Sequence, residues 1–360
     1  MNTHFHRLIV KRVTPETADS AAITFDVPPS LREAFNFTPG QFLTLRATIK
    51  GEPQRRSYSI CSSQSRFTHT LELEVGIKRV DGGVFSQWAT TNLKAGDTLE
   101  VMPPEGRFTP RLTGAVRRAG FAAGSGITPM LSIIASTLEA DAGSTFTLVY
   151  GNQRVSSIMF NEELQDLKDR FAARFTLMHV LSRQPQEAAL FNGRLDAANV
   201  TELLQTVLPA ASIDEAFICG PAGMIDATEL ALQQAGIAID RIHTERFFAD
   251  GATPTPRKPS TRPPGVKAAF ELAVVMDGKT HHFGMDAADH VLDVALDGGL
   301  DLPYSCKGGV CCTCRAKVLV GKVQMDRNFT LEPWEVEKGF VLTCQSRPLT
   351  EKVVVSYDER

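Results

Sequence analysis

Short segments in which apolar and polar residues alternate recur through the first third of the chain. FHRLIVKRV, AAITFDV and HTLELEVGI are three of them, and glycines and prolines stand between them. Alternation with a period of two is typical of a strand with one buried face. Several such strands in succession predict an antiparallel β-barrel over residues 1–113.

The pattern changes near residue 114. From there, strand-like runs such as AGFAAG, TFTLVYG and EAFICG alternate with stretches of helical periodicity. Strands that alternate with helices predict a parallel sheet covered by helices on both faces. This α/β domain is expected to span residues 114–248, with helices over 128–140, 160–170, 197–207 and 222–235.

A segment poor in apolar residues follows. The stretch ADGATPTPRKPSTRPPG contains five prolines, so a semi-rigid linker is predicted over residues 249–266. The remaining residues, 267–360, are expected to form a small α+β domain. It begins with AFELAVVMDGKTHHF, in which Asp277-Gly278 fits the tight turn of a hairpin.

Charge is distributed unevenly between these domains. The chain holds 38 basic and 41 acidic residues, and residues 267–360, with 11 basic and 14 acidic, carry the whole net charge of −3. A neutral body with a small acidic domain argues against a nucleic-acid partner and favours docking to a basic protein surface. The N-terminus has no signal-peptide pattern and no apolar run is long enough to span a membrane, so a cytoplasmic location is expected.

Four of the seven cysteines lie in one loop, CKGGVCCTC, residues 306–314. Cys306, Cys311 and Cys314 have the spacing C-x4-C-x2-C, and 29 residues separate the last of them from Cys344. This is the spacing of plant-type ferredoxins, whose four thiolates hold a 2Fe–2S cluster. The sequence therefore predicts such a cluster in the last domain.

The loop contains one more cysteine than the cluster needs. Cys312 is the extra residue, and we expect it not to be a ligand. A structural zinc site is the alternative, but such sites usually use two C-x2-C pairs and this chain has one. His281 and His282 are neighbours on a predicted strand, so their side chains should leave opposite faces rather than form a metal pair.

Two motifs in the barrel region suit a planar cofactor that carries phosphate. Arg56-Ser57-Tyr58-Ser59 ends a predicted strand, where an arginine fork matches phosphate oxygens and a tyrosine face suits a flat ring. GGVFSQW, residues 82–88, places two glycines before a helix, whose free amides form an anion site. Taken singly, these motifs also describe an ordinary strand tyrosine and an ordinary glycine turn.

The α/β domain carries a comparable loop. FAAGSGITPM, residues 121–130, runs from a strand through two glycines into a helix with Pro129 in its first turn. It lacks the last glycine of the dinucleotide fingerprint GxGxxG. Further on, CGPAGM follows the strand EAFI, and Glu245-Arg246-Phe247 ends the last predicted strand.

With these motifs in this order, the chain resembles the oxygenase-reductase branch of the ferredoxin–NADP reductase family. The resemblance implies a flavin-binding barrel, an NAD(P)-binding domain and a plant-type ferredoxin of the β-grasp fold. The proline that ends the glycine loop is also a feature of that family.

The resemblance assigns residues to the flavin. It places an arginine on the pyrophosphate, a tyrosine on the isoalloxazine ring and a serine near N5, with an aromatic residue covering the ring. FAD is expected, because the close members of the family use it, and FMN is the alternative. The residues implied are Arg56, Tyr58, Ser59, Gly82, Gly83, Ser86 and Phe247.

The resemblance also assigns residues to the nicotinamide nucleotide. Ser59, Cys219 and Glu245 are implied to form the catalytic group, which positions the reacting rings. NADPH is favoured over NADH because Ser182-Arg183 resembles a phosphate-binding pair and residues 151–157 contain no acid. The alternative is that these are solvated loop residues. The nucleotide-binding residues implied are Gly124, Gly126, Thr128, Pro129, Ser182, Arg183, Cys219 and Gly220.

Together the motifs predict a reductase that passes electrons from NADPH through FAD to the 2Fe–2S cluster and on to an external acceptor. The resemblance implies a di-iron oxygenase component as that acceptor. Reductases of steroid hydroxylases, ring-hydroxylating dioxygenases or desaturases are the alternatives, and a non-catalytic redox sensor is a more distant one. The linker predicts that the ferredoxin domain reorients between the flavin and the acceptor.

Overall fold

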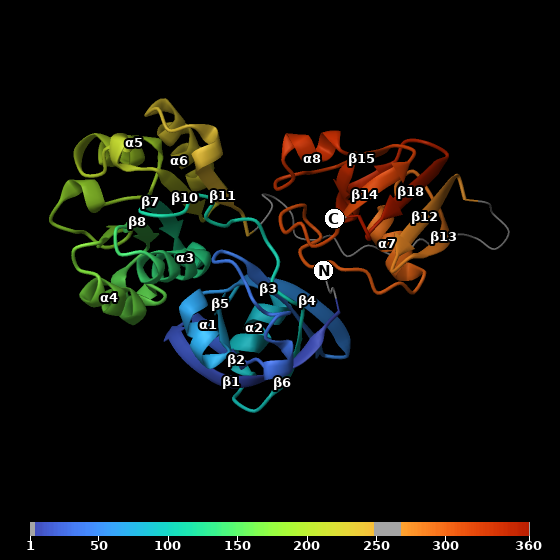
Figure 1. The fold of residues 1–360 in the computed structure, drawn as a ribbon, viewed down its shortest axis with the longest axis horizontal. Coiled ribbons are helices and arrows are strands. Elements are labelled where there is room, and N and C mark those ends of the chain that lie inside the picture. The colour runs from blue at the N-terminus through green and yellow to red at the C-terminus, as the bar shows by residue number, and fades with distance from the viewer. Residues whose placement is uncertain (1–3, 248–267, 360) are drawn as a thin grey trace. The chain divides into compact units, whose positions relative to one another are not determined.

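The computed structural model of the chain describes residues 4–247 and 268–359 (Figure 1). It divides into two compact units, Met1–Phe247 and Phe248–Arg360. The barrel and the α/β domain share the first unit, and the cysteine-rich domain forms the second. The predicted linker, 249–266, lies outside the described residues.

An antiparallel sheet forms the first part of the first unit. Its six strands run in the order β4-β3-β6-β1-β2-β5. A bridge between Ile60 and Val75 joins the two edges, so the sheet closes at that end into the predicted barrel. The elements of this part are β1 (His6–Thr17), β2 (Ser20–Asp26), β3 (Phe42–Ile49), β4 (Glu52–Ser59), α1 (Gln64–Thr70), β5 (Glu72–Lys78), α2 (Val84–Thr91) and β6 (Thr98–Val101).

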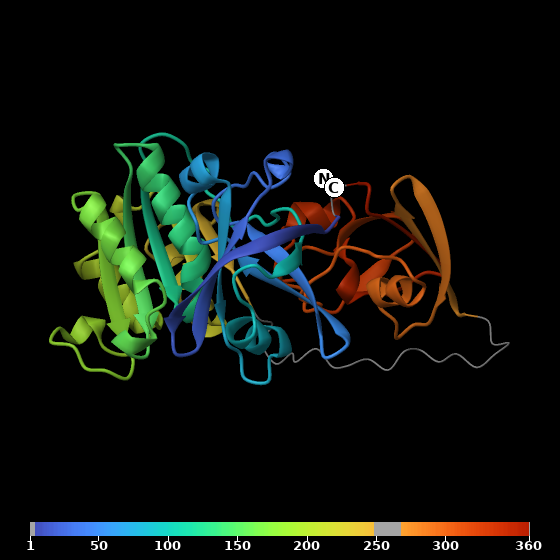
Figure 2. The same ribbon diagram turned by 90° about the horizontal axis from the view of Figure 1, so that it is seen from below.

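A parallel sheet of five strands forms the second part, in the order β11-β10-β7-β8-β9. The chain reverses its direction of winding between β7 and β10, which is where ligands bind in sheets of this kind. Helices α3 and α4 cover one face and α5 and α6 the other (Figures 1 and 2), as predicted. The elements are β7 (Arg117–Ala123), α3 (Ile127–Ala140), β8 (Thr145–Asn152), α4 (Asn161–Arg170), β9 (Phe175–Leu181), α5 (Ala197–Thr206), β10 (Glu215–Cys219), α6 (Ala222–Gln234) and β11 (Ile242–Glu245).

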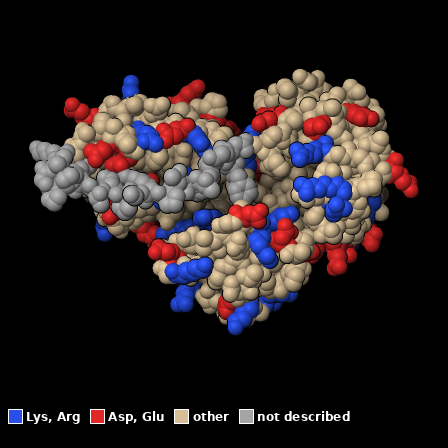
Figure 3. Space-filling view, turned by 180° about the vertical axis from the view of Figure 1, so that it is seen from behind, with Lys and Arg blue, Asp and Glu red and all other residues tan. Residues whose placement is uncertain are grey.

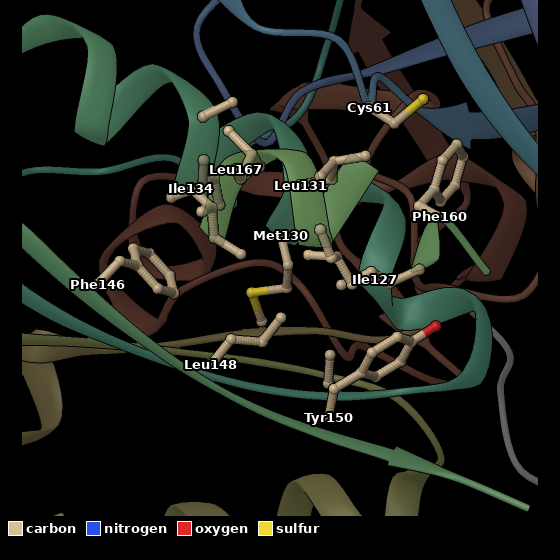
Figure 4. Packing of buried hydrophobic residues seen from close by; sticks show 14 of the residues in the cluster. Cys61, Ile127, Met130, Leu131, Ile134, Phe146, Leu148, Tyr150, Phe160 and Leu167 are labelled. Atoms are coloured by element: carbon tan, nitrogen blue, oxygen red, sulfur yellow. The ribbon is translucent and has the colours of Figure 1, made fainter. Parts of the chain in front are cut away.

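One hydrophobic core joins the two parts of this unit. Cys61 of the barrel packs in the same cluster as Ile127 and Met130 of α3 and Phe160 beside α4 (Figure 4). Phe160 approaches the barrel so closely that a Cβ on Gly76 of β5 would lie 2.8 Å from its ring. The barrel and the parallel sheet therefore meet through a tightly packed apolar interface.

The second unit contains a mixed sheet in the order β13-β12-β18-β14-β16, with β12 and β18 parallel. Asp277 and Gly278 both have positive φ, +51° and +70°, as the predicted hairpin turn requires. His282 lies 3.4 Å from Glu271 on the neighbouring strand. The elements are β12 (Phe270–Met276), β13 (Lys279–Met285), α7 (Val291–Asp297), β14 (Arg315–Val320), β15 (Val323–Met325), α8 (Pro333–Glu337), β16 (Phe340–Leu342), β17 (Ser346–Pro348) and β18 (Lys352–Ser356).

The surface carries both signs of charge. Acidic and basic side chains are interspersed over the face drawn in Figure 3. No helix within the described ranges is both long and apolar enough to cross a membrane.

Candidate functional site

The predicted glycine loop lies between β7 and α3. Gly124 has φ +54°, and a Cβ on Gly126 would lie 2.0 Å from the carbonyl oxygen of Cys219, so the second position has room only for glycine. Helix α3 begins without a side-chain cap, and the amide of its first residue, Ile127, donates to the Gly124 carbonyl, so an anion would be bound by the other amides of the loop and the first turn. Thr128 and Pro129 are buried in its first turn. This geometry fits the pyrophosphate of a dinucleotide.

The three residues predicted as the catalytic group lie together. Cys219 and Glu245 end neighbouring parallel strands and are paired in register. Ser59 ends the barrel strand β4, and its hydroxyl donates a hydrogen bond to the Glu245 carboxylate at 3.4 Å. The barrel and the parallel sheet thus each supply part of one polar group at the carboxyl end of the sheet.

Burial keeps the acidic groups of this cluster protonated. Desolvation raises the pKa of Glu245 to about 8, and the Ser59 hydrogen bond offsets it only in part. Burial also raises the pKa of the Cys219 thiol, and the nearby Glu245 adds to the effect. A neutral thiol is a poor nucleophile, so the arrangement suits positioning of a bound ring rather than covalent chemistry.

Of the remaining predicted flavin residues, Arg56 and Tyr58 lie on the barrel, and Phe247 follows β11 of the parallel sheet. Arg56 is exposed on β4, and Tyr58 is half-buried with its ring 5.7 Å from that of Phe85. Phe247 is half-buried and packs against the core that contains Cys219. An exposed guanidinium and a tyrosine fixed by packing fit a cofactor with a phosphate group and a flat ring.

The Gly-Gly turn precedes α2. Gly82 has φ +71°, and Gly83 begins the helix without a side-chain cap. The buried Ser86 hydroxyl accepts a hydrogen bond from the Val80 amide at 3.1 Å. Ser86 therefore fixes the turn, and the open amides of the helix remain available to a phosphate.

The loops that follow β8 and β9 are hydrogen-bonded to each other. The Ser182 amide donates to the Asn152 carbonyl, and the Arg183 amide donates to the Gln153 carbonyl, both at 2.9 Å. The Arg183 side chain is exposed. Ser182 and Arg183, the residues predicted to contact the nucleotide here, thus lie at the carboxyl end of the parallel sheet, as the glycine loop after β7 does.

Two polar residues that the sequence did not single out lie on the same strands. Three buried nitrogen atoms have no hydrogen-bond partner within the described part of the chain. They are the two ring nitrogens of His179 and the side-chain amide nitrogen of Asn152. Tyr150 lies beside the His179 ring and donates to the Gly124 carbonyl at 2.9 Å. Buried polar atoms of this kind are costly, so they fit a site completed by a ligand. Their only sequence signal was a polar residue inside an apolar strand.

The four predicted cluster ligands form two pairs. The Cys306 amide donates to Cys311 Sγ at 3.5 Å, and Cys314 and Cys344 influence each other's ionisation. The Gly308 amide donates to Cys306 Sγ at 3.3 Å, and amide donation together with the Cys311 thiol lowers the pKa of Cys306. Two thiolate pairs suit two irons, each of which takes two cysteines.

Cys312 lies apart from these pairs. Its Sγ is 3.2 Å from the Thr330 hydroxyl, and its backbone has φ +58°. Among the described residues, no three His, Cys, Asp or Glu side chains are close enough together for a single metal ion. Cys306, Cys311, Cys314 and Cys344 therefore stay the predicted ligands, and Cys312 stays the predicted extra residue.

Known families match each of the three domains. Residues 7–109 match the oxidoreductase FAD-binding domain, residues 121–230 the oxidoreductase NAD-binding domain and residues 274–349 the 2Fe-2S iron-sulfur cluster binding domain. One relative, a component of the 1,2-phenylacetyl-CoA epoxidase of Escherichia coli (strain K12), is 45% identical over 361 residues, which cover 99% of both chains.

The chain belongs to the oxygenase reductases of the ferredoxin–NADP reductase family. The ferredoxin reductase component of 3-ketosteroid-9-alpha-monooxygenase from Rhodococcus rhodochrous is 36% identical to this reductase, over 97% of this chain and 96% of that one. The glycine betaine monooxygenase reductase subunit of Pseudomonas aeruginosa (strain UCBPP-PA14) is 29% identical over 98% of this chain and 95% of its own. The protein is thus an NAD(P)H-dependent oxidoreductase that transfers electrons through FAD and a 2Fe–2S cluster, and oxygenases are its class of partner.

Solved structures agree on the fold. Phthalate dioxygenase reductase has a TM-score of 0.60 at 21% identity and matches over 98% of each chain. An intact type IV self-sufficient cytochrome P450 monooxygenase has a TM-score of 0.68 at 21% identity, over 98% of this chain and 41% of that one. The predicted combination of barrel, parallel sheet and ferredoxin is therefore confirmed.

Proposed function

We propose that this chain is the reductase component of a 1,2-phenylacetyl-CoA epoxidase and that the di-iron oxygenase component of that enzyme accepts its electrons. The observation that carries the proposal is the 45% identity to the epoxidase component over 99% of both chains. The steroid monooxygenase reductase, at 36%, is the second candidate. Oxygenase reductases of one family share their domains, so overall similarity rather than any single residue supports this choice.

The flavin site in this proposal is the barrel surface near β4 and α2. Arg56 would pair with the pyrophosphate, Tyr58 would lie against the ring, and Phe247 would cover it. The amide of Gly82 and the first turn of α2 would bind the phosphate end, and Gly83 and Ser86 would fix the turn through their hydrogen bonds to Val80. When bound, FAD accepts a hydride and releases electrons singly, which a one-electron cluster requires.

The nicotinamide site is the carboxyl end of β7, β10 and β11. The amides of Gly124, Gly126 and Thr128 would bind the pyrophosphate, and Pro129, which has no amide hydrogen, would fix the first turn of α3. Gly220 gives the backbone close access to the nicotinamide. The side chains of Ser59, Cys219 and Glu245 would hold the two rings in contact and exclude water.

The cluster ligands in this proposal are Cys306, Cys311, Cys314 and Cys344. Their pairwise contacts and amide hydrogen bonds support the assignment. We also propose a cytoplasmic location, because all seven cysteines are free and disulfides are rare in that compartment.

NADPH is the proposed hydride donor, since Arg183 and Ser182 supply a guanidinium and a hydroxyl for the 2′-phosphate. Arg183→Ala should raise KM for NADPH about 10-fold, the value of one charge-assisted contact, and leave KM for NADH unchanged. Steady-state dye reduction with each nucleotide measures both values. A parallel rise for NADH would remove Arg183 from phosphate recognition.

The proposed function is tested by measuring whether NADPH oxidation is coupled to epoxide formation. The purified reductase, reconstituted with FAD and iron–sulfur, is mixed with the phenylacetyl-CoA epoxidase oxygenase complex, NADPH and phenylacetyl-CoA. One epoxide per NADPH consumed is the expected result. Rapid dye reduction without epoxide would preserve the reductase chemistry and transfer the assignment to another oxygenase, with the steroid monooxygenase tested next.

A further inference from the structure

Two aromatic side chains of the second unit are conspicuously exposed. Phe329 is 44% exposed and Trp334 is 46% exposed. Every other phenylalanine, tyrosine and tryptophan in the described ranges is buried or half-buried. Val336, 41% exposed, lies with Trp334 on α8. Large aromatic groups usually gain more from burial than any others, so exposure of both in one short segment calls for an explanation.

The backbone around Phe329 is ordered by specific contacts. The Asn328 side chain accepts hydrogen bonds from the Leu331 amide at 2.8 Å and the Thr330 amide at 3.2 Å. The Phe329 amide donates to the Gly309 carbonyl at 3.1 Å. Since Gly309 belongs to the cysteine loop, Phe329 is fixed directly beside the predicted cluster.

Helix α8 is attached to the same region by an ion pair. Glu335 is fully buried and lies 2.9 Å from Arg315, the residue that follows Cys314. The Trp334 indole donates to the Glu332 carboxylate at 2.6 Å. Both aromatic residues are therefore presented on a rigid support next to the cysteine loop, which lowers the entropy that a partner would lose by binding them.

An external partner explains this exposure better than the flavin of the same chain does. The two units are covalently joined, so the flavin reaches the cluster at high effective concentration without binding energy. A separate oxygenase has to bind, and interfaces obtain most of their affinity from a few buried aromatic anchors, tryptophan above all. Residues 267–360, the ferredoxin domain itself, also carry a net charge of −3, which favours a basic rim on the partner.

We propose that Phe329 and Trp334 are the anchors by which the ferredoxin domain docks its oxygenase component, through apolar pockets with a basic rim. The identity of that oxygenase rests on the proposed function. Docking at this segment brings the acceptor against the loop of Cys306–Cys314, the part of the backbone that surrounds the predicted cluster. Electron transfer and recognition thus use one surface.

The test uses the full-length holoprotein. The variants are Phe329→Ala and Trp334→Ala, with Trp334→Phe as the conservative change. Leu319→Ala and Leu349→Ala are matched controls, because these residues are exposed by 45% and 58%. Leu319 lies near the end of β14 that is remote from Cys314, and the amide of Leu349, which follows β17, donates to the carbonyl of Lys322 just beyond that end. The dissociation constant for the phenylacetyl-CoA epoxidase complex is measured by biolayer interferometry, and cluster reduction by NADPH without acceptor by stopped-flow spectroscopy.

Each alanine variant at an aromatic position should weaken binding at least 10-fold, Trp334→Phe should recover most of the loss, and the controls should stay within twofold of wild type. Equal binding by all variants would overturn the docking proposal. Slower cluster reduction in the aromatic variants, with the cluster spectrum intact, would assign the segment to the flavin instead.

Failure of the wild type to bind the epoxidase would count against the proposed function. The docking proposal is then decided with cytochrome c, a basic protein acceptor. A raised KM for cytochrome c in the two aromatic variants and not in the leucine controls would uphold it. The same KM in all variants would refute it.

Discussion

At the scale of single residues, environment decides what each ionisable group can do. Desolvation raises the pKa of both Glu245 and Cys219, although one is a carboxylic acid and the other a thiol. Cys306 has the opposite shift, because amides and a neighbouring thiol favour its thiolate. The direction of the pKa shift thus differs among the cysteines, upward for Cys219, Cys311 and Cys314 and downward for Cys306.

Glu245→Gln should remove a pH dependence of stability. A carboxyl group with a raised pKa binds its proton more tightly in the folded chain, so wild type loses stability as pH rises from the unfolded pKa of 4.5 towards about 8. We expect wild type to lose about 1–3 kcal/mol more than the variant across that range. Urea unfolding of both proteins near pH 5 and pH 8 measures the difference, and equal slopes would contradict it.

Cys312→Ser should leave the visible and EPR spectra of the cluster unchanged. The Cys312 sulfur contacts the Thr330 hydroxyl, which a serine hydroxyl can also contact, and it belongs to neither thiol pair. Cys314→Ser is the matched control and should abolish the native spectrum. Loss of the cluster in the Cys312 variant would show that the ligand set is wrong.

At the scale of elements, the glycine loop depends on close backbone approach. Gly126 lies against the carbonyl of Cys219, so the start of α3 and the end of β10 are in van der Waals contact. This contact brings the amides predicted to bind pyrophosphate next to the predicted catalytic group. The distance between the two sites therefore depends on Gly126 having no side chain.

Gly126→Ala should destabilise the first unit by about 1–3 kcal/mol and raise KM for NADPH, because its Cβ would displace the backbone. Gly223→Ala offers a control within α6, where a Cβ would meet nothing within 4 Å. That change should be neutral or stabilising by up to about 1 kcal/mol. Thermal unfolding and NADPH titrations distinguish the two, and an undisturbed KM in Gly126→Ala would contradict the close-contact argument.

At the scale of the whole molecule, two units with separate cores divide the work. The core of the second unit consists of its own residues and includes Cys314 and Cys344. The first unit holds every residue predicted for the flavin and the nicotinamide. Hydride chemistry and single-electron delivery are thus assigned to structures that can fold independently.

A chain of residues 1–247 should keep NADPH-dependent ferricyanide reduction within about twofold of the full-length protein, because its core is complete. It should lose reduction of cytochrome c and of the oxygenase, since it lacks the cluster. Steady-state assays with the three acceptors measure this. Undiminished cytochrome c reduction would mean that electrons leave directly from the flavin.

Local features were predictable from the sequence because they depend on neighbours along the chain. The four helices of the parallel domain form within one residue of their predicted ends, since periodicity and flanking glycines are local signals. The hairpin at Asp277-Gly278 also forms as expected. The spacing of Cys306, Cys311 and Cys314 predicts the cluster from the sequence alone, because ligand geometry constrains a short loop.

Contacts between distant segments were decided only by the tertiary structure. Sequence order gave no distance for the hydrogen bond between Ser59 and Glu245, which are 186 residues apart. Nor did it indicate that the ring nitrogens of His179 would be buried without a hydrogen bond from any described residue, or that Phe329 and Trp334 would face solvent. Composition and periodicity determine which elements form, whereas burial and proximity arise when those elements pack, and the proposed docking surface depends on that second step.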